Sequence, residues 1–289
     1  MVKYNPRTWF SLIFHSYSRQ VVKTLFPGLF FMGLYTAVIT FLMEDYFKVS
    51  FNSTTVVHSL LGIVLGLFLV FRINSAYDRW WEGRKLWGSL LNNSRNLATK
   101  IDAYLPIEES QARMFFLNMI PNFSLALKEH LRSGAKTEEL QLEEEYGQKL
   151  KGKTHIPNMI ISFMYKEIVK LTAQKKISNE QFFVLDKELK QLSDILGGCE
   201  RIKNTPIPYS YSMFIKKFIF TYTVTLPFAF ITEFHYVTIP IVLMVFFILV
   251  SVELVAEEIE DPFGRDVNDL PTDELHEKIK ANVQELFEN

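Results

Sequence analysis

Hydrophobic residues gather into four long uncharged stretches that are separated by polar segments of very different length. A helix needs about 20 consecutive apolar residues to cross the hydrocarbon core of a bilayer. The pattern therefore predicts membrane-spanning helices at residues 24–43, 49–72, 214–232 and 234–252. Residues 1–23 are amphipathic and are expected to form a cytoplasmic helix at the membrane surface.

The second stretch carries the most informative pattern. Ile63, Leu67 and Phe71 recur every fourth residue and share one helical face. Gly62 and Gly66 fall near this face, where missing side chains allow other helices to approach closely. One interpretation is a helix that packs against lipid or neighbouring helices. The other is a face turned toward a central axis, where several copies form stacked apolar rings that gate by dewetting.

The long middle segment, residues 73–213, alternates polar and apolar positions with helical periodicity and is expected to be an all-helical cytoplasmic region. Its predicted helices cover residues 76–100, 108–132, 157–174 and 178–196. Ser178 is a candidate N-cap of the last of these, and Gly197-Gly198 are expected to end it. Its apolar positions form a buried seam of Phe182, Leu185, Leu189, Leu192 and Leu196.

The C-terminal segment, residues 253–289, begins with an acidic turn and ends in a predicted helix, Pro271–Phe287, with Thr272 as a capping candidate. Lys and Arg residues lie before the first predicted span, after the second and before the third. The positive-inside rule therefore places both termini and residues 73–213 in the cytoplasm, with the spans in the plasma membrane. The opposite loops carry Glu44, Asp45 and Glu233, which are expected to form an acidic outer mouth that concentrates cations.

Composition narrows the function classes. The 289-residue chain is 48% hydrophobic with a net charge of −1, so no global field attracts nucleic acid. Its single cysteine, Cys199, excludes an intrachain disulfide. The six histidines show no ligand spacing, and no catalytic arrangement of residues is recognisable. We therefore expect no enzyme activity, no cofactor and no metal site. His58 lies inside a predicted span, where an ionisable group marks a water path or a hydrogen-bonded helix end.

Three motifs carry a resemblance to a known family. They are FRINSAYDRWWEGRKLWG at residues 71–88, CERIKNTPIPYSY at 199–211 and IEDPFGRDVNDLP at 259–271. Together they resemble the bestrophin family of ion channels, and more closely its bacterial branch. The resemblance implies a homopentamer in which Ile63, Leu67 and Phe71 line the pore neck. It also implies a second, cytosolic constriction near Phe182–Leu185, for which Phe183 or Val184 is expected because both lie off the buried seam.

The acidic turn resembles the calcium clasp of eukaryotic bestrophins. Asp266 and Asp269 stand at matching positions, whereas Arg265 replaces the first acidic residue of the clasp and Asp261 replaces an asparagine. A permanent cation inside a calcium site opposes binding. We therefore expect no high-affinity calcium site here, and a turn tied by ion pairs to the next subunit instead.

These observations predict an all-α membrane protein of four transmembrane helices with a large helical cytoplasmic region, assembled as a bestrophin-like pentameric channel. Its partners are copies of itself, membrane lipid and the permeating ions. Leu67 replaces the phenylalanine of eukaryotic members, whose positive ring edge meets anions, and this favours monovalent cations such as sodium. An anion channel of the same fold stays open, as do a secondary transporter and a non-conducting membrane scaffold.

Overall fold

The structure is a computed structural model that describes residues 16–48, 55–132, 140 and 142–288, and within these ranges it contains helices and no β-strand. The chain divides into two compact units. The first unit comprises Met1–Arg79 with Pro206–Glu260, and the second comprises Trp80–Thr205 with Asp261–Asn289. Residues 1–15, most of the predicted surface helix, lie outside the described residues.

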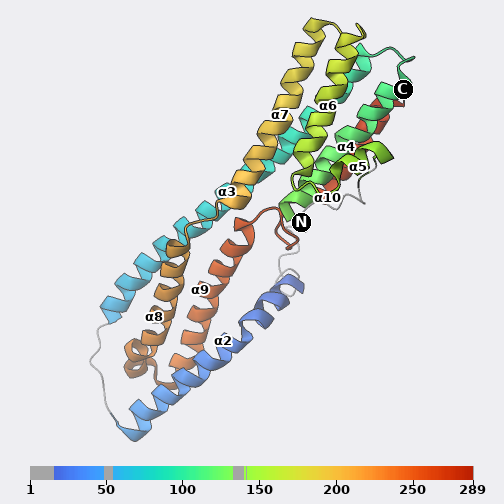
Figure 1. Ribbon diagram of the computed structural model, residues 1–289. Coiled ribbons are helices and arrows are strands. Elements are labelled where there is room, and N and C mark those ends of the chain that lie inside the picture. The colour runs from blue at the N-terminus through green and yellow to red at the C-terminus, as the bar shows by residue number, and fades with distance from the viewer. Residues whose placement is uncertain (1–15, 49–54, 133–139, 141, 289) are drawn as a thin grey trace. The chain divides into compact units, whose positions relative to one another are not determined.

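The first unit is built from helices, drawn in Figure 1, that contain long apolar stretches. It contains α2 (Ser16–Phe41), the first part of α3 (Thr55–Tyr104), α8 (Tyr209–Phe234) and α9 (Thr238–Glu260). Helix α9 packs against both α2 and α8. A 3₁₀ turn at His235–Val237 joins α8 to α9, and His235 reverses the chain with a positive φ of 49°. A π-helical turn, Leu42–Tyr46, follows α2.

Three stretches of the described chain are long and apolar enough to cross a membrane. They are Gln20–Tyr46, Thr55–Tyr104 and Tyr209–Glu260. The third stretch contains both α8 and α9, which fold back and pack on each other. Only 17–22% of the apolar windows is buried within the chain. So much exposed apolar surface is unfavourable in water and requires a nonpolar environment or partners.

The second unit is a helical bundle around its own core. It contains the remainder of α3, α4 (Ser110–Arg132), the short α5 (Glu144–Leu150), α6 (Ile156–Ala173), α7 (Asn179–Asn204) and α10 (Thr272–Phe287). Helix α4 packs against α6 and α10, and α6 packs against α7. Trp87, Phe116 and Phe123 are completely buried in this core. Helices cover all four ranges predicted for the middle region. Their bounds agree within a few residues, except that α3 begins much earlier, at Thr55, and α7 ends later, at Asn204.

Helix α7 confirms one predicted end and corrects the other. Ser178 and Gln181 form a reciprocal capping box at its start. At the other end the predicted stop at Gly197-Gly198 is wrong, because the helix continues to Asn204. Gly198 serves packing instead, since a Cβ at this position would lie 2.9 Å from the side chain of Leu86 on α3.

One further expectation, the cap of the last helix, is wrong. Thr272 does not cap α10, because the cap position is Pro271 and the Thr272 hydroxyl accepts a hydrogen bond from Arg132 at 3.0 Å. Helix α3 runs unbroken from the predicted second span into the middle region. The third predicted span has no such continuity, because α7 ends before the Pro206–Pro208 segment and α8 begins after it.

Candidate pore-lining site

Helix α3 presents two different faces within the first unit. Leu65 and Leu69 are buried against Ile215 and Ile219 of α8. Ile63, Leu67 and Phe71 lie on the opposite face, with 72%, 55% and 55% of each residue exposed. Successive helical residues turn by about 100°, which separates the two sets as observed. The three predicted neck residues therefore share an outward apolar face that the described residues of this chain leave largely uncovered.

The two glycines near this face differ. A Cβ at Gly62 would lie 2.8 Å from the hydroxyl oxygen of Tyr222, so the absent side chain leaves room for the end of this α8 side chain. A Cβ at Gly66 would meet no described atom within 4 Å. The neighbour at Gly62 is thus the end of a side chain, and the described chain offers no neighbour at Gly66, so the close approach of helices stays a prediction.

Arg72, directly after Phe71, is turned inward and is 1% exposed. Its Nη2 lies 2.8 Å from Oε2 of Glu260, and its Nε lies 3.4 Å from Oε1 of Glu253. Glu253 is itself 3% exposed. Sequence reasoning treats Arg72 only as a flanking charge, because its two partners follow more than 180 residues later in the sequence. At the C-terminal end of the α3 stripe, the buried guanidinium of Arg72 therefore contacts two carboxylates.

Two of the three acidic residues expected at the outer mouth have hydrogen-bond partners in the structure. Glu44 lies 2.7 Å from Nδ1 of His235, and Asp45 accepts a hydrogen bond from the hydroxyl of Tyr236. Glu233 is exposed. These contacts link the turn after α2 to the turn between α8 and α9. They give Glu44 and Asp45 hydrogen-bond partners within the same unit.

His58 has a local partner on the neighbouring helix. Its Nε2 lies 3.2 Å from Oγ1 of Thr225 on α8, and its ring is tilted against that of Tyr222. This geometry agrees with the interpretation of a hydrogen-bonded histidine near a helix end. No further role follows from it.

The acidic turn is tightly organised by hydrogen bonds within the second unit. Oδ2 of Asp269, which is 3% exposed, accepts the backbone N–H of Asp266 at 2.6 Å. Arg132 of α4 donates to the carbonyls of Phe263 and Gly264 at 3.3 and 3.2 Å. Trp80 of α3 donates its indole N–H to the carbonyl of Asn268 at 2.9 Å.

Charged side chains of α4 form ion pairs with residues in and just after this turn. The guanidinium of Arg132 and the ammonium of Lys128 hold the pKa of Asp273 far below its usual range through hydrogen bonds and charge. Arg265 is mostly exposed, and its Nη2 lies 3.9 Å from Glu129. The observed ties thus run to α3 and α4 of the same chain, whereas the sequence suggested ties to the next subunit.

Phe183 and Val184, the candidates for a cytosolic constriction, lie near the start of α7. They are 71% and 37% exposed, whereas the adjacent Leu185 is completely buried. Both side chains therefore point away from the core of the second unit, as their position off the seam predicts.

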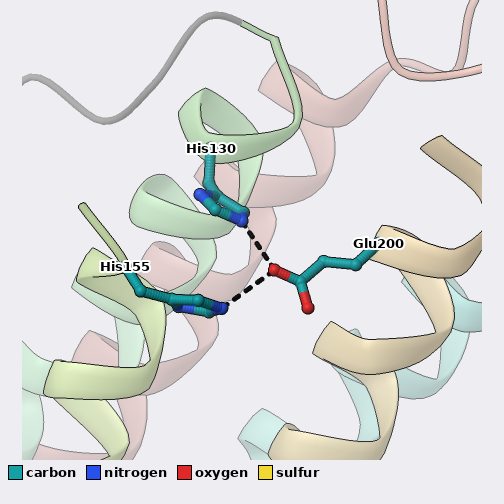
Figure 2. A group of neighbouring side chains, drawn as sticks. All are labelled: His130, His155 and Glu200. Atoms are coloured by element: carbon teal, nitrogen blue, oxygen red, sulfur yellow. Dashed lines mark hydrogen bonds and ion pairs between the residues drawn. The ribbon is translucent and has the colours of Figure 1, made fainter. Parts of the chain in front are cut away.

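One group of side chains escaped sequence reasoning. His130 of α4, His155 at the start of α6 and Glu200 of α7 converge on a common point (Figure 2). The Nε2 atoms of the two histidines lie 2.7 and 2.9 Å from Oε1 of Glu200. The three residues are far apart in the sequence, so no spacing motif could have revealed them.

The exposed apolar helices of the first unit and the helical bundle of the second define an all-α integral membrane protein. A sequence model described as Bacterial/Fungal Bestrophin protein matches residues 1–285. The chain therefore belongs to the bestrophin family, and the resemblance found in its three motifs is confirmed.

Individual relatives agree with this assignment. A voltage-dependent anion channel-forming protein of Nostoc sp. is 34% identical, over 96% of this chain and 91% of that protein. The voltage-dependent anion channel-forming protein YneE of Escherichia coli (strain K12) is 30% identical, over 92% and 88%. The crystal structure of a bacterial bestrophin homologue from Klebsiella pneumoniae superposes with a TM-score of 0.84, at 30% identity, over 90% of this chain and 97% of that one.

Proposed function

We propose that this protein is the subunit of a homopentameric ion channel whose pore neck is lined by Ile63, Leu67 and Phe71. The observation that carries the proposal is the outward apolar face of α3, which lies opposite the face that packs on α8. A single stripe cannot enclose a pore, so closed cyclic symmetry is needed to bring several stripes together. Membership of a family whose relatives are named channel-forming proteins supports the same reading over an enzyme.

For the permeating ion we propose monovalent cations, with sodium among them. Apolar rings set a dehydration barrier and cannot select charge by contact. The nearest charged group is Arg72, which is buried and contacts the carboxylates of Glu253 and Glu260, so its positive charge is compensated and is not exposed to attract anions. Leu67 also lacks the positive ring edge that an aromatic side chain offers to an anion.

The alternative is an anion channel of the same fold. The names of the Nostoc and Escherichia coli relatives favour it, because both are called anion channel-forming. The reversal potential across a bilayer with an NaCl gradient separates the two. We expect a value near the sodium equilibrium potential, and a value near that of chloride would overturn the cation proposal.

The proposed setting is the inner membrane, with both termini and the second unit in the cytoplasm. Each of α2, the first part of α3, α8 and α9 then crosses once. This arrangement places the positively charged flanks inside. It puts the turn with Glu44, Asp45 and Glu233 at the outer mouth. Phe183 and Val184 of each copy would then line the cytosolic constriction.

A matched pair of variants tests the neck directly. Leu67→Ala removes part of the apolar ring, and we expect a several-fold larger current through purified channels because the dewetting barrier is lower. Leu34→Ala on α2 is the control, because Leu34 is 54% exposed against 55% for Leu67. If Leu67 faces lipid, both variants will conduct like the parent protein.

The same recordings separate the two other classes of function. A secondary transporter gives a flux that saturates at low substrate and shows no single-channel steps. A non-conducting scaffold gives no current with either variant. Counting the rotational symmetry of the detergent-solubilised protein by electron microscopy tests the pentamer independently, and a monomer would remove the basis for a pore.

A further inference from the structure

The group of His130, His155 and Glu200 has the donor set of a transition-metal site. Three different helices supply the residues, and one ligand atom from each lies within 4.8 Å of the other two. Both imidazole rings point their Nε2 atoms at the same carboxylate oxygen (Figure 2). The two rings are close and only moderately inclined, with centroids 4.8 Å apart and an interplanar angle of 32°.

We propose that His130, His155 and Glu200 bind a divalent transition metal ion, with zinc as the expected occupant. Two imidazole nitrogens and one carboxylate oxygen form a ligand set that zinc readily accepts, and a water molecule completes a tetrahedral shell. Calcium and magnesium prefer sites made of oxygen ligands only. The site is separate from the pore-lining residues and does not depend on the proposed channel function.

The distances require only a small adjustment. Ligand atoms that each lie about 2.1 Å from a tetrahedral ion are about 3.4 Å apart. The observed separations of 2.7 and 2.9 Å are shorter, as expected for hydrogen bonds between the same atoms. The carboxylate has to withdraw by roughly half an ångström. Glu200 is only partly buried, so its side chain has room for this movement.

The surroundings limit the affinity. Coordination through Nε2 places the proton of His155 on Nδ1, which is buried and has no hydrogen-bond partner among the described residues. Metal-bound histidines ordinarily donate this proton to an acceptor, and losing that acceptor weakens binding by about 10–100-fold. Cys199, the neighbour of Glu200 on α7, is buried in the hydrophobic core of the second unit and is not among the three converging ligands. We therefore expect micromolar binding.

Bound metal would connect α4, α6 and α7 at one point of the second unit. An ion that binds the folded state alone stabilises it by mass action. At a zinc concentration a hundred times the dissociation constant, we expect the melting temperature to rise by about 5 °C. This rise should vanish when excess chelator is added.

The experiment is a zinc titration of the full-length, tag-free, chelator-treated protein in detergent, in competition with a chromophoric chelator. We expect one zinc ion per subunit. His155→Asn and Glu200→Gln should each weaken binding at least tenfold. His130→Gln keeps an N–H donor toward Glu200 but loses the imidazole, so it should fold like the parent and still lose zinc.

His235→Asn is the matched control. His235 is an exposed histidine that also contacts a carboxylate, Glu44, but among the described residues it belongs to no group of converging metal ligands. It should leave zinc binding and the melting-temperature rise unchanged. The proposal is overturned if zinc does not bind at micromolar concentration, or if the three site variants bind it as the parent does. The three residues would then be a hydrogen-bonded cluster only.

Discussion

Arg72 offers the sharpest test of how the first unit is held together. Replacing it with methionine keeps much of the side-chain volume and removes the guanidinium. Removing one partner of a buried ion pair costs about 3–5 kcal/mol, because the remaining charge stays buried without compensation. Glu253, with 4% of its side chain exposed, bears most of this cost.

Glu260 is less affected by the same change. Its side chain is 15% exposed, and Oε1 also accepts the backbone N–H of Ile207 at 2.8 Å. Water and this second donor relieve part of its loss. We therefore expect Arg72→Met to lower the free energy of unfolding by about 3 kcal/mol, the lower end of the range for buried pairs.

The assay is reversible or scan-rate-controlled thermal unfolding in detergent, applied to Arg72→Met, Glu253→Gln and the double variant. We expect the double variant to lose clearly less than the sum of the single losses, with a coupling of about 1–3 kcal/mol. Lys217→Met is the control, since it removes an exposed cation from α8 and should change stability little. A loss below about 1 kcal/mol for Arg72→Met, or additive effects, would refute the reasoning.

Two further predictions concern the second unit. Ser178→Ala removes the capping box with Gln181 and should lower the unfolding free energy by about 1 kcal/mol in chemical denaturation, and no change would show that the cap contributes nothing. Burial lowers the pKa of His276 from its usual 6.5, and its Nδ1 lies 2.7 Å from the hydroxyl of Ser124. The stabilising contribution of the neutral ring is complete above pH 6.5 and is lost as the pH falls toward the lower folded-state pKa. His276→Gln should flatten the melting-temperature profile between about pH 5 and 7, and an unchanged slope would contradict this origin.

Most of the fold could be predicted from the sequence, because helical periodicity and long uncharged stretches are local features of the chain. The leucine seam of α7 is confirmed, with Leu185, Leu189 and Leu192 completely buried. The failure at Gly197-Gly198 has a tertiary cause. Glycine ordinarily ends a helix, but here packing of Gly198 against Leu86 requires the small residue inside it.

The candidate sites differ in how far the sequence alone could predict them. The stripe of Ile63, Leu67 and Phe71 is visible in the sequence because its residues lie on one helix. The partners of Arg72 and the group around Glu200 are not, because tertiary packing alone brings their members together from distant segments. A periodic pattern also indicates which residues share a helical face, but it does not distinguish a face in contact with lipid from one that lines a pore.

If α3 lines the neck as proposed, the inward position of Arg72 constrains how that neck can open. Phe71 and Arg72 are consecutive residues, so their side chains point about 100° apart on the helix. A rotation of α3 that carried Phe71 away from a central axis would also draw Arg72 away from Glu253 and Glu260. Breaking these buried contacts costs about 3–5 kcal/mol in each subunit. Small displacements of α3 together with α8 and α9, or changes of side-chain rotamer at Leu67 and Phe71, avoid this cost. Gating by movement of the packed helices as a group is therefore favoured over rotation of the pore helix alone.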